Sequence, residues 1–205
     1  MESGAGSPQV VASEVAAERA AEVFAEAFNR DPVWGWAFPD EDRRFQQHTV
    51  FWRFFIDAAA AHGWVWLSAG GGAATLWVPP GCPEVSAGDE ERIEPMLTDL
   101  VGAAQTEVLL ETFERFDAAH PPDPPHYYLS LLGTHSDHRG RGVGMRLLAD
   151  NLGAIDEEGM PAYLESTNPE ANNHRYERLG FRQVGEFDLP GDGPPVATMW
   201  REARA

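Results

Sequence analysis

The stretch that decides the fold is LLGTHSDHRGRGVGM, from Leu131 to Met145, where three glycines stand at alternate positions between an apolar run and an amphipathic one. The apolar run predicts the end of a strand, and the amphipathic run predicts the start of a helix. Glycine lets the backbone approach a ligand closely, and the first N–H groups of a helix lack internal partners and carry partial positive charge. The segment is therefore typical of an anion site suited to a phosphate or pyrophosphate. Arg139 and Arg141 add formal positive charge to it.

Three kinds of phosphate-binding loop join a strand to a helix, and they differ in their fixed positions. A P-loop needs a lysine, and this chain contains none. The dinucleotide fingerprint G-x-G-x-x-G fails because Met145 occupies its third glycine position, although Glu165 stands near the place of its ribose-binding acid. The pattern R/Q-x-x-G-x-G/A is met by Arg139, Gly142 and Gly144. The remaining alternative is an Arg/Gly-rich surface loop that binds nothing.

The segments around this loop predict a single α/β domain with a mixed central β-sheet flanked by helices. Strands are expected at Gln9–Ala12, Trp64–Ser68, Ala73–Val78, Tyr127–Thr134, Ala162–Glu165, Arg182–Leu189 and Val196–Trp200. Helices are expected from a Ser13 cap to Asp31, over Asp40–His62, over Asp89–His120 with an interruption at Pro95, over 142–158, and over Glu170–Leu179 with Gly180 closing the last. For residues 1–12, a frayed tail is the alternative to the short strand at Gln9–Ala12.

Composition limits the classes of function. The net charge of −18 disfavours nucleic acid and anionic membranes as partners and favours cationic small molecules. Cys82 is the one cysteine, so no internal disulfide forms, and its thiol suits a reducing cytoplasm. Neither a secretory signal pattern nor a run of about 18 apolar residues occurs. We therefore expect a cytoplasmic protein without a membrane span.

A second motif gives the loop a family context. The stretch NNHRYERLGF, from Asn172 to Phe181, contains N-x-x-x-Y-x-x-x-G-F and follows the next predicted strand. Together the two motifs resemble the GNAT N-acetyltransferase superfamily over roughly residues 127–200. PAYLES at Pro161–Ser166 and the ending GPP at 193–195 resemble the antibiotic-modifying branch that includes puromycin N-acetyltransferase. The chain departs from the common pattern at Thr134, where valine is usual, and at Ser136, where proline is usual.

The resemblance implies a GNAT-like fold with a splayed strand pair at the cofactor site, and acetyl-CoA as cosubstrate without a metal. Residues 126–205 would form the acetyl-CoA-binding core, and 1–125 the acceptor-side half. Tyr176 is implied as the general acid for the coenzyme A thiolate, with a packing role as the alternative, and Asn172 as a cofactor contact or a helix cap. The expected cofactor-binding residues are Leu132, Gly133, Thr134, Arg139, Gly140, Arg141, Gly142, Val143, Gly144 and Asn172.

The remaining chemistry depends on residues outside the motifs. Glu165, a carboxylate on a strand beside the expected cleft, is the first candidate for a general base, and a surface ion pair is its alternative. His135 and His138 stand around Asp137, but no third metal ligand has a suitable spacing. An acceptor pocket is one interpretation of Trp34, Trp36, Trp66 and Trp77, and the protein core is the other.

The function expected from these observations is acetyl transfer from acetyl-CoA to a primary amine of a small molecule. Two alternatives stay open: a non-catalytic acyl-CoA-binding regulatory domain, and an N-acetyltransferase that acts on proteins. The oligomeric state is also open between a monomer and a homodimer.

Overall fold

The computed structural model describes residues 7–60 and 63–204. Its strands form one sheet in the order β1-β2-β3-β4-β5-β7-β6, in which β4 and β5 pair in parallel and all other neighbours are antiparallel. The strands are β1 Gln9–Val10, β2 Val65–Leu67, β3 Ala73–Val78, β4 Tyr127–Thr134, β5 Ala162–Ser166, β6 Arg182–Asp188 and β7 Pro195–Arg201. The helices are α1 Glu14–Phe28, α2 Pro32–Ala37, α3 Arg44–Ala60, α4 Ala87–Val101, α5 Ala103–Ala119, α6 Val143–Glu157 and α7 Pro169–Glu177. A single turn of 3₁₀ helix covers Ser136–His138.

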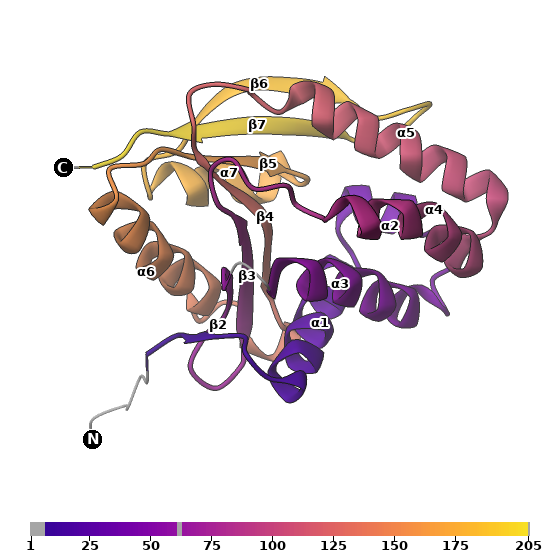
Figure 1. The fold of residues 1–205 in the computed structure, drawn as a ribbon, viewed down its shortest axis with the longest axis horizontal. Helices are drawn as coiled ribbons and strands as arrows, with labels where there is room; N and C mark the ends of the chain where they lie inside the picture. Colours follow the sequence, from indigo (N-terminus) through magenta and orange to yellow (C-terminus); the bar gives the residue numbers. More distant parts are fainter. Residues whose placement is uncertain (1–6, 61–62, 205) are drawn as a thin grey trace.

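The sheet separates two hydrophobic cores. On one face α1 and α3 pack against β3 and β4, and α2, α4 and α5 continue this layer (Figure 1). On the other face α6 and α7 cover the sheet. The buried amide oxygen of Asn151 on α6 accepts hydrogen bonds from Thr75 at 2.7 Å and from Trp77 at 3.1 Å, both on β3. The mixed α/β fold predicted from the sequence is confirmed.

A β-bulge interrupts β4 at its centre. Leu129 pairs with Trp77, and Leu131 pairs with Leu76, so Ser130 is an extra residue opposite β3. The bulge exchanges the two faces of the strand. Leu129 therefore packs in the core beneath α6, whereas Leu131 packs in the core beneath α1 and α3.

The bulge coincides with a separation of β4 from β5. Their parallel pairing covers Tyr127 to Leu129 on β4 and ends at Leu164 on β5. Beyond this point β4 stays paired with β3, and β5 stays paired with β7. The splayed strand pair therefore leaves one edge of β4 open from Ser130 to Thr134.

Most elements lie where the sequence predicts them, with instructive exceptions. Ser13 caps α1 as expected, its hydroxyl accepting from the Ala16 N–H. The sequence predicts only that a helix ends at Asp31 and does not predict α2. In the structure the Asp31 carboxylate also caps this short helix. The expected break at Pro95 is wrong, because α4 continues through Pro95 and ends at Gly102, which has a φ of 81°.

Some sequence expectations fall where no structure is described. Residues 1–6 of the expected tail and the end of the expected helix at 61–62 lie outside the described residues. Within the described part of the chain, no helix has both the length and the apolar character needed to span a membrane.

Candidate active site

A single cavity of about 1460 Å³ occupies the gap between the splayed strands. At one end it is lined by the glycine loop, the start of α6, and α7. At the other end it is lined by α3, α4, α5 and the loop that follows β3. The open edge of β4 connects the two ends, so a ligand at the glycine loop and a ligand among the helices would meet there.

The glycine loop has the backbone conformation that the sequence predicts. Gly140 and Gly142 have φ values of 75° and 68°, in the left-handed region that favours glycine. Gly144 lies against β4, and a Cβ there would collide with the hydroxyl of Thr134. Among the described residues, no acceptor is recorded for the N–H groups of Val143, Gly144 and Met145, and the first turn of α6 carries no acidic residue. These free donors make an anion site at the cavity wall.

The two arginines of the loop differ in their surroundings. Arg139 lines the cavity, and its guanidinium donates to the carbonyl groups of Glu26 and Ala27 at the end of α1, at 3.0 and 3.2 Å. Arg141 is exposed and does not line the cavity; its carbonyl group accepts from Arg146 at 2.8 Å. Of the two loop arginines, only Arg139 therefore faces a ligand in the cavity, and its guanidinium is already hydrogen-bonded to the end of α1.

The bulge determines what the open edge of β4 offers. The His135 N–H donates to the Gly72 carbonyl on the β3 side. Because N–H groups alternate in direction along a strand, those of Leu132 and Thr134 point to the open edge. Leu132 and Thr134 also line the cavity, whereas Gly133 packs against Phe24 of α1, which fills the space that a side chain would need. A pantetheine chain at this edge would find backbone donors.

Tyr176 and Asn172 line the cavity on α7. Burial, with a smaller contribution from the nearby Asp31, raises the pKa of Tyr176 to about 12. The phenol is thus held in its neutral, proton-donating form, and its ring also packs against Phe181 with centroids 6.1 Å apart. Asn172 is not the helix cap, because the Asn168 side chain fills that position by accepting from the Ala171 N–H.

Glu165 reaches the cavity from β5 on the face opposite to Tyr176. Its side chain is 2% exposed, and neither carboxylate oxygen has a hydrogen-bond partner among the described residues. Burial, together with repulsion from Glu84, raises its pKa to about 8, even though the nearby hydroxyl groups of Tyr128 and Tyr163 act to lower it. The surface ion pair considered as an alternative is excluded by this burial.

A histidine pair beside Glu165 is a feature that the sequence analysis missed. His126 donates from Nδ1 to the Pro124 carbonyl at 2.8 Å, so its Nε2 accepts from His120 Nε2 at 3.0 Å. The unprotonated Nδ1 of His120 then lies 3.8 Å from Glu165. Burial and the neighbouring His126 lower the pKa of His120 to about 4. His120 is therefore neutral near pH 7 and gives Glu165 no counter-charge.

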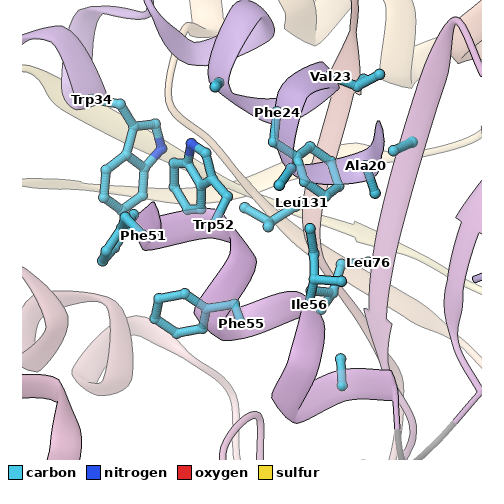
Figure 2. Close-up of a cluster of buried hydrophobic side chains, with 14 of the residues drawn as sticks. Ala20, Val23, Phe24, Trp34, Phe51, Trp52, Phe55, Ile56, Leu76 and Leu131 are labelled. Atoms are coloured by element: carbon cyan, nitrogen blue, oxygen red, sulfur yellow. The ribbon is translucent and has the colours of Figure 1, made fainter. Parts of the chain in front are cut away.

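Aromatic side chains line the acceptor end of the cavity. Figure 2 shows Trp34, Phe51, Trp52 and Phe55 gathered beside one another, and all four line the cavity. The Phe51 and Phe113 rings lie parallel with centroids 6.3 Å apart. Trp34, named from the sequence, and Trp52, which the sequence did not single out, both line the cavity and both belong to the buried core.

The other three tryptophans named from the sequence do not line this cavity. Trp77 is fully buried beneath α6, and Trp66 packs against the same core. Trp36 packs against the core on the opposite face. No group of three potential metal ligands occurs in residues 7–60 or 63–204.

Comparison with known proteins agrees with this geometry. A family model described as an acetyltransferase (GNAT) domain matches residues 99–183. An uncharacterized N-acetyltransferase of Schizosaccharomyces pombe is 32% identical over 88 residues, a match that takes in 42% of this chain and 35% of that protein.

Solved structures match over nearly the whole chain. A histone acetyltransferase HPA2 and related acetyltransferase from Corynebacterium glutamicum has 24% identity and a TM-score of 0.64, with 98% of both chains covered. Arylalkylamine N-acetyltransferase 2 from Aedes aegypti has 13% identity and a TM-score of 0.63, with 96% of this chain and 98% of that chain covered. Residues 99–183 therefore match a GNAT acetyltransferase domain, and the fold over nearly the whole chain is that of solved acetyltransferases.

Proposed function

We propose that this protein transfers the acetyl group of acetyl-CoA to a primary amine of a small molecule. One observation carries the proposal: a single cavity joins the free N–H groups of α6 and the open edge of β4 to the buried, unpartnered carboxylate of Glu165. The first two features suit the pyrophosphate and pantetheine of coenzyme A. The third suits an ammonium group that must lose a proton.

Each part of the site has a task in this reaction. The N–H groups at the start of α6 hold the pyrophosphate, and those of Leu132 and Thr134 hold the pantetheine and orient the thioester. With its pKa near 8, Glu165 is partly ionised at neutral pH and takes a proton from the bound ammonium. The neutral amine attacks the thioester carbon, the C–S bond breaks, and Tyr176 donates its proton to the departing thiolate. The nitrogen loses its second proton as the amide forms, and this proton returns to the Tyr176 phenolate through solvent.

The site also favours a particular acceptor. The aromatic side chains at the acceptor end would pack around an apolar or aromatic body, and the carboxylates of the same cavity would attract a cation and repel an anion. We therefore propose a preference for aromatic or otherwise hydrophobic primary amines over amino acids such as glutamate. The Pro161–Ser166 resemblance to the antibiotic-modifying branch and the fold shared with arylalkylamine N-acetyltransferases are compatible with this preference.

The two ends of the cavity also motivate a division of the chain into functional halves. We propose that residues 126–205 bind acetyl-CoA and that residues 1–125 form most of the acceptor site. Glu165, from the C-terminal half, would contribute the base that activates the amine.

Coenzyme A release over a panel of amines tests the proposal. With acetyl-CoA present, kcat/KM is expected to be highest for a phenylalkylamine, lower for a short aliphatic amine and lowest for glutamate. Equal values for the first two would contradict the aromatic pocket, and a better value for glutamate would contradict the electrostatic argument. Binding of acetyl-CoA without release for any amine would favour the non-catalytic alternative.

A further inference from the structure

The cavity contains more carboxylates than a single ammonium group can neutralise. Besides Glu165, the acceptor end is lined by five acids that come from the loop after β3, from α4 and from α5: Glu84, Glu90, Glu94, Glu114 and Asp117. Over residues 7–60 and 63–204, none of these five lies within ion-pair distance of an arginine or histidine. Burial raises the pKa of Asp117 and of Glu84, and the neighbouring acids add to both shifts: Glu90 and Glu114 for Asp117, and Asp117 for Glu84.

The charges in the cavity are divided between its ends. Its arginines are Arg30 at the end of α1, Arg139 in the glycine loop, and Arg175 and Arg178 at the end of α7. They serve the end that suits an anionic cofactor. No arginine lines the acceptor end in the described part of the chain, and His120 is neutral there near pH 7.

The acids occupy two depths. Glu165 lines the inner end of the cavity, and both of its carboxylate oxygens are buried there. Glu90, Glu114 and Asp117 are exposed at the mouth. Glu84 lies between them: it accepts from Ser130 at the bulge and raises the pKa of Glu165. A reacting ammonium at Glu165 would leave the mouth carboxylates without a cation.

We infer that the acceptor is a dication: a diamine whose reacting amine binds at Glu165 and whose second cationic group binds among Glu84, Glu90, Glu114 and Asp117, with an apolar spacer along the aromatic wall. The inference rests on the proposed function and names the acceptor's class more narrowly. The second cation brings favourable Coulomb energy to a group of acids that otherwise repel one another. Aromatic faces along the spacer also accept cations.

The test compares α,ω-diaminoalkanes of increasing length with monoamines of equal length. Dissociation constants are measured calorimetrically without acetyl-CoA, and kcat/KM is measured with it. The best diamine is expected to exceed its matched monoamine by about tenfold in both quantities, a factor that decreases with added salt. The length of the best diamine then reports the distance between the two cation positions.

Two variants with equal changes in charge assign the effect to the mouth of the cavity. Glu114→Gln with Asp117→Asn is expected to bring the diamine-to-monoamine ratio close to one. Glu107→Gln with Glu111→Gln alters the same helix outside the cavity and is expected to keep the wild-type ratio.

Equal binding of diamines and monoamines by the wild type would overturn the inference, as would a ratio that persists in the Glu114/Asp117 variant. If diamines bind more tightly and no amine is acetylated, the second cation position is supported and the proposed function fails. The two claims are thus separable.

Discussion

The two ends of the cavity would recognise the ligands proposed for them in different ways. The cofactor end is built mainly from one continuous segment, the end of β4 and the loop into α6, and its donors are backbone N–H groups. The acceptor end is assembled from α3, α4, α5, β5 and the loop after β3, and it presents side chains. Backbone recognition thus leaves a local pattern in the sequence, whereas recognition by side chains from distant elements leaves none.

The two ends also differ in the free energy needed to place their functional groups in the folded protein. The free N–H groups at α6 are the ordinary consequence of starting a helix. Glu165 is a carboxylate buried without a partner, and its raised pKa measures the unfavourable free energy of ionising it there. The acceptor end should therefore show both the largest losses of activity on mutation and a gain of stability when its charge is removed.

The largest effect is expected for Glu165→Gln, which keeps the shape of the side chain and removes its basicity. We expect kcat/KM to fall by about 10³-fold, within the range of general base catalysis. In the wild type kcat/KM should rise with pH through about 8, because the base must be ionised, and the variant should lose this limb. Glu186→Gln, an exposed change on β6, is the matched control. An unchanged pH profile in the Glu165 variant would contradict the assignment.

The same variant tests the energetic side of the comparison. The pKa of Glu165 is about 8 in the folded protein against an ordinary value of 4.5, so ionisation favours the unfolded chain as pH rises from 4.5 to 8. At pH 7 the raised pKa destabilises the folded protein by about 3 kcal/mol. The Glu165→Gln variant should recover only part of this free energy, because the buried glutamine amide also lacks hydrogen-bond partners. Glu165→Gln should raise Tm at pH 7 and have little effect at pH 4. A lower Tm at pH 7 would contradict the account.

The next largest effect is expected for Tyr176→Phe, on the cofactor side. The substitution keeps the ring against Phe181 and removes the proton donor. We expect kcat to fall by about 10²-fold with the dissociation constant of acetyl-CoA nearly unchanged. A wild-type kcat for a good acceptor would leave Tyr176 with a packing role only.

The smallest effect on the chemical step is expected at the glycine loop, where a substitution should mainly weaken acetyl-CoA binding. Gly142→Val places a β-branched residue at a φ of 68°, and it should weaken acetyl-CoA binding by roughly tenfold or more and reduce the Tm increase that the ligand produces. Gly153→Ala on the same helix meets nothing within 4 Å and serves as the control. If Gly142→Val binds acetyl-CoA like the wild type, the loop is not the anion site.

The sequence predicts the strand, the glycine loop and the helix of the proposed cofactor end for a physical reason. The bounds of β4 and the glycine positions depend on contacts between neighbours in the chain, which periodicity and glycine spacing report. Two local signals were ambiguous: Asp31 both follows one helix and caps the next, and Pro95 is tolerated inside α4 whereas Gly102 ends it.

The acceptor end was predictable only in part. Glu165 and Trp34 were found because they stand near predicted strands or in an aromatic-rich stretch. Trp52, His120 and Asp117 come together only through packing of α3 and α5 around the sheet, which no spacing along the chain reveals. The bulge at Ser130 likewise depends on the register between β3 and β4.

A crystal structure with coenzyme A bound tests the central claim most directly, because it locates both ends of the cavity at once. The account predicts the pyrophosphate within hydrogen-bond distance of the N–H groups of Val143 and Gly144, and the thiol beside β4 between Tyr176 and Glu165. A coenzyme A molecule bound elsewhere, or one whose thiol points away from Glu165, would contradict it.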